Sequence, residues 1–248
     1  MVGRALWTSL PRVSSWLNRA VAVPTLGFAL DPLIRPSAFL WRDLEELTTR
    51  WAREPIQVAD LEPMKIRIER SSGVHCTIDQ QNIVVGFSYP VALTEDGRQL
   101  AFVKVGEKRA FTDLLPLLRE TAADLCSLLV KKRSISRIGV VANVKLPPDA
   151  PPPGVEQYLN HLGRPWRSAP EAVVSRVTAR LSVTERCHHQ LQWQTDATVL
   201  ALNLDWQRLY EPPREVEAKS LEKLAVEACD SALQYFDKFG EGDLNYGD

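Results

Sequence analysis

The stretch from Phe111 to Leu146 constrains the fold most strongly, because it joins a long amphipathic segment to a nearly unbroken apolar run. Over 111–129 the apolar residues recur at spacings of three and four, which predicts a helix with one buried face. Thr112 is suited to cap the start of this helix, and Pro116 falls in its first turn, where proline is tolerated. The run 137–146 predicts a strand buried on both faces. We therefore expect this helix and strand to form the centre of the fold.

The elements expected on either side of this centre repeat one order. Strand, helix, several antiparallel strands and a long helix are predicted from about Val21 to Lys132, and again from about Arg137 to Phe239. Residue identity between the two stretches is slight, so the repeat lies in the pattern of elements. We predict an α+β fold of two pseudo-symmetric halves that form one curved antiparallel sheet backed by helices. The predicted divisions are an N-terminal amphipathic segment (1–20), a first half (21–135), a second half (136–239) and an acidic, mobile tail (240–248).

The predicted order of elements resembles the pseudo-symmetric saddle of the TATA-box-binding protein. This resemblance concerns topology alone, and a shared fold does not carry a shared function.

Three short motifs suggest a second resemblance. They are Leu26-Gly-Phe-Ala-Leu-Asp-Pro-Leu33, Phe39-Leu-Trp-Arg-Asp-Leu44, and Asn143 followed by a proline-rich loop. Together they resemble a sporadically distributed family of uncharacterised bacterial proteins. The resemblance implies a bacterial, cytoplasmic protein, and the scattered occurrence of that family suggests an association with mobile elements or antiviral defence. The resemblance supplies no established activity and no catalytic residue.

Charge and cysteine content narrow the functional classes. The 248 residues carry a formal net charge of -1, which argues against a protein that coats nucleic acid, although a local basic face is compatible with it. The four cysteines, Cys76, Cys126, Cys187 and Cys229, form no CxxC pair. We interpret them as reduced core residues of a cytoplasmic protein. The sequence shows neither an apolar run of membrane-spanning length nor a signal peptide.

Catalytic signatures are lacking in the sequence. It contains no glycine-rich nucleotide-binding motif, no HExxH and no GxSxG, so we expect no cofactor and do not favour an enzyme. The only metal or nucleophile candidates are Cys187 and His188, next to His189, with His75-Cys76 as a matching pair in the first half. Adjacent strand residues point to opposite faces, which favours a structural role for these side chains.

The N-terminal segment has no acidic residue before Asp31, and it carries leucines at helical spacing beside Trp7 and Trp16. Such a segment is suited to a partner groove or to a membrane surface, although packing on its own domain is the commoner role of an amphipathic helix. We expect a detachable docking element. Deleting residues 1–18 should then change stability by less than about 1 kcal/mol.

The remaining candidate site is the polar face of the predicted sheet, which could equally be its ordinary solvated side. The leading hypothesis is a non-enzymatic binding or assembly subunit of a bacterial multi-protein complex, and the seven tryptophans support it because tryptophan is favoured at interfaces. A nucleic-acid-binding module that places Arg67, Arg176 and Arg180 on phosphates is the alternative. A Cys187–His188 enzyme is the third hypothesis. The predicted partner-binding residues are Trp7, Trp16, Lys65, Arg67, Arg176, Arg180 and Gln192.

Overall fold

The structure is a computed structural model. It describes residues 15–31, 41–51, 54–62, 64–89, 91–96, 99–104, 107–129, 133–163, 172–194 and 199–243. Trp7 and most of the predicted N-terminal segment lie outside these ranges, as do the last five residues of the predicted tail.

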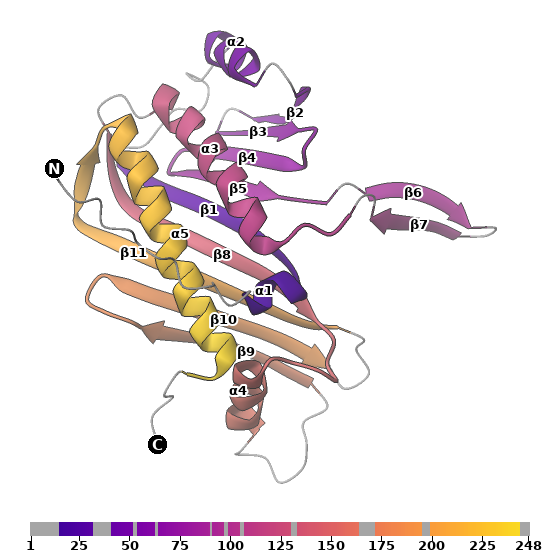
Figure 1. The fold of residues 1–248 in the computed structure, drawn as a ribbon. Coiled ribbons are helices and arrows are strands. Elements are labelled where there is room, and N and C mark those ends of the chain that lie inside the picture. The colour runs from indigo at the N-terminus through magenta and orange to yellow at the C-terminus, as the bar shows by residue number, and fades with distance from the viewer. Residues whose placement is uncertain are drawn as a thin grey trace, which may run out of the picture.

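A nine-stranded antiparallel sheet forms the body of the molecule, in the order β2-β3-β4-β5-β1-β8-β11-β10-β9 (Figure 1). A separate hairpin of β6 and β7 projects away from it (Figure 1). The strands are β1 (Val21–Asp31), β2 (Ile56–Glu62), β3 (Lys65–Arg70), β4 (Val74–Asp79), β5 (Asn82–Phe87), β6 (Val91–Asp96), β7 (Gln99–Lys104), β8 (Arg133–Leu146), β9 (Ala172–Arg180), β10 (Glu185–Gln194) and β11 (Leu200–Val216).

Two strands that are far apart in sequence, β1 and β8, are neighbours at the centre of the sheet. On one side of β1 the order outward is β5, β4, β3 and β2, and on the other side of β8 it is β11, β10 and β9. Every pairing is antiparallel. The first strand of each predicted half therefore lies inside the sheet, and the strands that follow it extend outward.

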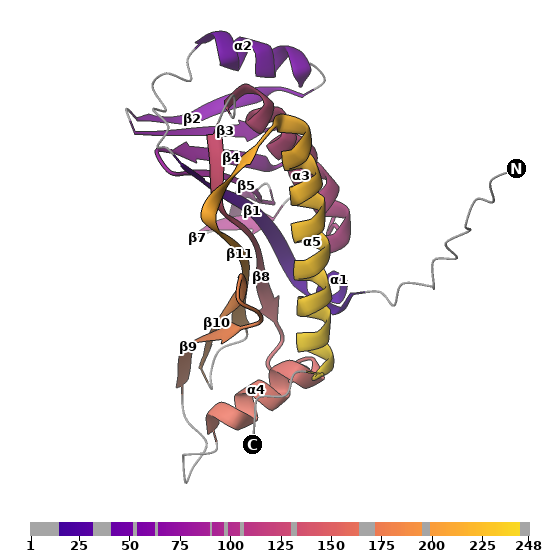
Figure 2. The same cartoon turned by 90° about the vertical axis from the view of Figure 1, so that its left-hand side faces the viewer.

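Helices cover one face of this sheet. They are α1 (Trp16–Arg19), α2 (Trp41–Arg50), α3 (Phe111–Leu129), α4 (Pro153–Gly163) and α5 (Ala218–Glu241). Figures 1 and 2 show α3 and α5 side by side across the central strands, with α4 near the end of α5. In Figure 2 the outer strands lie farther from α5 than the central strands do, so the uncovered face is concave.

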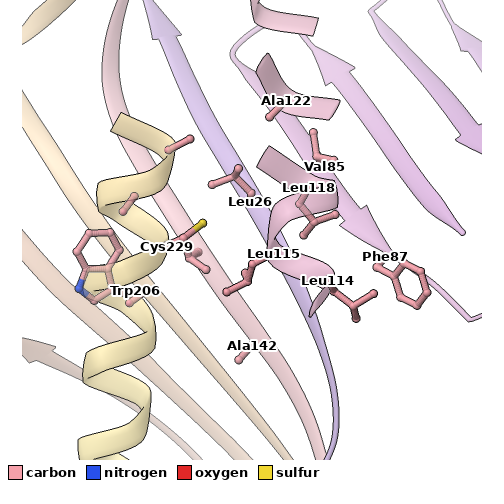
Figure 3. Packing of buried hydrophobic residues seen from close by; sticks show 14 of the residues in the cluster. Leu26, Val85, Phe87, Leu114, Leu115, Leu118, Ala122, Ala142, Trp206 and Cys229 are labelled. Atoms are coloured by element: carbon pink, nitrogen blue, oxygen red, sulfur yellow. The ribbon is translucent and has the colours of Figure 1, made fainter. Parts of the chain in front are cut away.

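The helix predicted over 111–129 is α3, with the same bounds. Its buried residues, among them Leu114, Leu118 and Leu125, follow the helical spacing of the sequence. Figure 3 shows Leu118 packed near Leu26 of β1 and Val85 of β5, and Leu114 pointing toward Phe87 at the end of β5. The N-terminus is held from outside the helix, because the backbone N–H of Thr112 donates to Asn18 Oδ1 at 3.1 Å.

The central strand β8 is buried on one face only, so the prediction of burial on both faces is wrong. Val140, Ala142 and Val144 are buried beneath the helices, whereas the intervening Asn143 and Lys145 are exposed. The reason is that the helices form a single layer, and nothing in the described part of the chain covers the opposite face of β8.

The end of the predicted N-terminal segment belongs to the core. Trp16 is 6% exposed and Leu17 is 1% exposed, and both pack in the hydrophobic cluster. The indole Nε1 of Trp16 donates to the carbonyl oxygen of Phe236 in α5 at 2.7 Å. The prediction that Trp16 binds a partner is therefore wrong. Trp16 and Leu17 belong to the core and not to a detachable segment.

Within the described residues, no helix combines the length with the hydrophobicity that a bilayer crossing requires.

Candidate binding face

The uncovered concave face of the sheet, which we call the open face, is the candidate functional site. Strand register assigns side chains to it, because directly opposite residues of neighbouring strands lie on the same face. One row across the sheet runs through Thr178, His188, Asp205, Val141 and Thr25. The charged side chains that the register places on this face, among those that the structure describes, are Asp31, Glu62, Lys65, Arg67, Glu69, Asp79, Arg137, Lys145, Arg176, Arg180, Arg186, Asp205 and Glu215.

The basic side chains of the open face gather toward β9, although the whole chain has a net charge of -1. Over β9, β10, 137–146 of β8 and 200–209 of β11, this face carries five basic side chains and one acidic side chain, Asp205. Arg67 pairs with Glu69 on the same strand, with 2.8 Å between Nε and Oε1. Within the described ranges, five basic side chains of this face form no ion pair with a carboxylate. They are Arg137, Lys145, Arg176, Arg180 and Arg186.

A hydrogen-bonded chain orients one of these arginines. Arg186 Nε donates to Gln207 Oε1 at 3.2 Å, and Gln207 Nε2 donates to Asp205 Oδ2 at 2.7 Å. Burial raises the pKa of Asp205 above its usual value, while the hydrogen bond from Gln207 and the charges of His188, Arg137 and Arg186 oppose that rise. The carboxylate thus anchors the amide that positions Arg186.

Two further pairs fix polar groups on the same face. Thr178 Oγ1 lies 2.8 Å from His188 Nδ1, which joins β9 to β10. Asn203 Nδ2 donates to Asn143 Oδ1 at 2.7 Å, which joins β11 to β8. Polar side chains that are already held by one another lose little conformational freedom when a partner binds.

A hollow of about 600 Å³ opens on this face where β1, β8 and β11 meet the chain that leaves β5. Val21, Val23 and Tyr89 contribute to its lining, and Lys145 reaches it from β8. Its amide side chains are Asn143, Gln190, Gln192 and Asn203. A surface that combines apolar area with amide donors and acceptors is suited to hold a polar macromolecule or a ligand in one orientation.

A smaller hollow of about 340 Å³ shares Ser88 and Tyr89 with the first and contains His75. Gly86 leaves the space for this imidazole, because a Cβ at position 86 would lie 2.7 Å from His75 Nε2. Burial, followed by the charge of Arg67, lowers the pKa of His75 below its usual value. The imidazole is thus held in its neutral form more strongly than an exposed histidine.

The predicted partner-binding residues do not form one cluster. Lys65 and Arg67 lie on β3, whereas Arg176 and Arg180 lie on the outermost strand β9. At about 4.8 Å between strands, the two pairs are roughly 34 Å apart along the sheet. Gln192 lies between them and lines the larger hollow. A single partner that contacts all of these residues must therefore extend across most of the sheet.

Cys187 and His188 lie on opposite faces of β10, as their adjacency predicts. Cys187 is buried opposite Trp206, and burial raises the pKa of its thiol strongly. His188 lies on the open face with Thr178. No group of three or more metal-ligating side chains occurs among the described residues. The two side chains cannot act on one substrate in this arrangement, so the pairing proposed from sequence is not supported.

Sequence reasoning missed Arg186 and Asp205, although the signal was present. Asp205 lies within β11, which continues to Val216. The alternation of polar and apolar residues continues through 200–206, which would have placed Asp205 on the same face as Asn203.

The fold and the open face together define the class of this protein. It is an α+β chain in which helices cover one side of an antiparallel sheet, and the other side, which is polar and concave, is open. Comparison with known proteins gives no relative, because no family model, curated protein or solved structure matches this chain.

Proposed function

We propose that this chain is a non-enzymatic binding subunit that holds a partner protein against the open face of its sheet. The observation that carries the proposal is the pre-arranged polar surface there, in which Arg186, Gln207 and Asp205 form a hydrogen-bonded chain beside arginines that lack carboxylate partners. An ordinary solvated face gains little from such fixed groups, whereas a binding face gains affinity from them.

The chemistry of the cysteines supports a binding role over a catalytic one. All four thiols are buried, and burial raises the pKa of Cys76 and of Cys229 to about 12. A nucleophilic cysteine needs a thiolate at neutral pH, so these side chains are suited to the core.

We also propose that the halves 21–135 and 136–239 are pseudo-symmetric, with β1 and β8 as equivalent strands. In both halves the strands extend outward from this central pair, and a long helix follows them in the chain. This arrangement supports the likeness in topology to the TATA-box-binding-protein saddle. The resemblance to the uncharacterised bacterial family suggests a link to mobile elements or antiviral defence, so the products of neighbouring genes are the first partners to test.

Co-expression with the products of neighbouring genes, followed by size-exclusion light scattering, tests the proposed function. The open-face variant Gln192→Arg/Asn203→Arg should lose a complex that the native chain forms, because two long cations would fill the amide-lined hollow. The matched control is Lys223→Glu on α5, whose side chain is 80% exposed and lies away from the open face. A complex that survives the open-face change, or a chain that binds none of these products, contradicts the proposal.

Nucleic acid is the second candidate partner, and the unpaired cations of the open face favour it. A local basic patch can attract phosphates even when the total charge is close to zero. Gel-shift titration at two salt concentrations tests this candidate, because the electrostatic attraction is strongest at low salt. Absence of binding at low salt removes it, and binding that Arg180→Ala and Arg186→Ala do not weaken removes the open face as its site.

A further inference from the structure

The strand β9 forms an open edge of the sheet. Its nine residues, 172–180, pair without interruption with 194–186 of β10. In the described part of the chain no strand pairs with its other side. Figure 1 shows β9 as the last strand beyond β10. Alternate backbone N–H and C=O groups along that side are therefore available to another strand.

The opposite edge, β2, has the protection that natural edge strands usually carry. The register with β3 is irregular between Val58 and Asp60. Pro55 precedes the strand and Pro63 follows it. Bulges and prolines of this kind prevent a further strand from pairing. The register of β9 shows no such irregularity, and its sequence AVVSRVTAR contains no proline.

The side chains of β9 on the open face are positively charged at alternate sites. Arg176 and Arg180 flank Thr178, and Arg186 of β10 lies directly opposite Arg180. Like charges directly opposite each other are unfavourable in a sheet. Neither Arg176 nor Arg180 has a carboxylate partner among the described residues. On the other face of β9, Val177 is 40% exposed.

We propose that the edge of β9 binds an extended acidic segment of a partner protein, which adds one strand to the sheet. Backbone hydrogen bonds supply the pairing, and acidic side chains four residues apart lie beside Arg176 and Arg180. The partner residue midway between the two acidic residues lies beside Thr178. The other two partner residues, on either side of the middle one, point to the opposite face of the sheet, where Val177 lies. This inference rests on the proposed binding function and specifies the part of the partner that is bound.

A second copy of this chain fits the edge less well. A symmetric antiparallel pairing that uses all nine residues is centred on Arg176 and places that arginine opposite itself. Charge complementarity therefore favours an acidic segment of a different protein.

The probe is a synthetic peptide with the core Glu-Val-Thr-Val-Glu, which presents the same pattern to β9 in either strand direction. It is titrated to millimolar concentration into the isotope-labelled full chain, and backbone amide signals are followed by NMR. We expect shifts and slowed hydrogen exchange confined to 172–180 and the adjacent part of β10. Absence of shifts, or shifts elsewhere, overturns the proposal.

Charge exchange tests the contacts that the proposal names. The variant Arg176→Glu/Arg180→Glu should bind the peptide about tenfold more weakly, and a peptide with Lys in place of Glu should restore binding to that variant. Both arginines are exposed, so the fold should persist, and the thermal midpoint checks this. A peptide methylated on alternate backbone nitrogens should not bind. If it binds equally well, the contact is not strand pairing.

Three other results separate this inference from competing partners and from the proposed function itself. If single-stranded DNA of equal charge displaces the peptide and binds more tightly, nucleic acid is the ligand and the inference is wrong. If the native chain dimerises and Arg176→Glu/Arg180→Glu abolishes the dimer, a second copy occupies the edge. If this variant still forms the complex with a neighbour-encoded protein while the peptide fails to bind, the proposed function stands and the edge inference is wrong.

Discussion

His189 should make the protein lose stability in mild acid. It lies on the helix-covered face of β10 and is 1% exposed. Its Nε2 lies 2.8 Å from the hydroxyl oxygen of Tyr235, its ring packs at 4.9 Å between centroids from Phe239, and Tyr158 approaches it edge-on. Its Nδ1 has no hydrogen-bond partner among the described residues. Burial, with a smaller contribution from the charge of His188, lowers the pKa of His189 to about 4.

The sign of the effect follows from where the proton binds. The unfolded chain has a histidine pKa of about 6.5, so between that value and about 4 it binds the proton more strongly than the folded chain. The stability that neutral His189 contributes is fully present when the pH is above the histidine pKa of the unfolded chain. It is lost as the pH falls from about 6.5 to about 4. Linkage gives a loss of about 2 kcal/mol between about pH 7.5 and about pH 5.

Urea unfolding at these two pH values measures the loss. The native chain should lose about 2 kcal/mol more on acidification than His189→Gln, whose amide can still meet the Tyr235 hydroxyl. The comparison uses the change with pH within each protein, because the substitution also alters packing at neutral pH. His161→Gln, an exposed position on α4, is the matched control and should behave like the native chain. Equal losses in the native chain and in His189→Gln would refute this reasoning.

Three further results are expected. Trp16→Ala should lower the free energy of unfolding by about 3 kcal/mol or more, because it leaves a cavity and removes the hydrogen bond to α5. If thermal unfolding shows a loss below about 1 kcal/mol, the docking-segment hypothesis is restored. Gly154→Ala should destabilise the protein by more than about 1 kcal/mol, because its Cβ would collide with the carbonyl oxygen of Phe239. Gly27→Ala serves as the control, because a Cβ there would lie 3.8 Å from the nearest atom, Cγ2 of Val84. A thiol-reactive probe followed by mass spectrometry should label Cys187 as slowly as the other three cysteines, and rapid labelling of Cys187 in the folded chain would contradict its burial.

Local sequence patterns predicted the elements that depend on local geometry. The apolar spacing over 111–129 defined α3, since a helix buries residues three and four apart whatever lies opposite. Lys65 and Arg67 were predicted on the polar face of the sheet, and both lie on the open face, because alternate residues of a strand share one face. Opposite directions for Cys187 and His188 followed from adjacency alone.

The candidate site was only partly predictable, because its geometry depends on which strands are neighbours. Arg67 and Arg180 were expected to act together, yet strand order separates them by most of the sheet. The hydrogen bonds that link Arg186 to Gln207 and Gln207 to Asp205 form because β10 and β11 pair in one register. A one-residue shift would move every one of these side chains to the other face.

The sequence by itself determined an α+β chain with a central helix and strand, polar alternation along its strands and four cysteines in apolar surroundings. Only the tertiary structure decided that Trp16 lies in the core, that Asn143 and Lys145 of the central strand are exposed, and that the helices leave one concave face open. The physical reason is that periodicity specifies which side of an element is apolar. What covers each side depends on contacts between residues distant in sequence, and periodicity carries no information about those contacts.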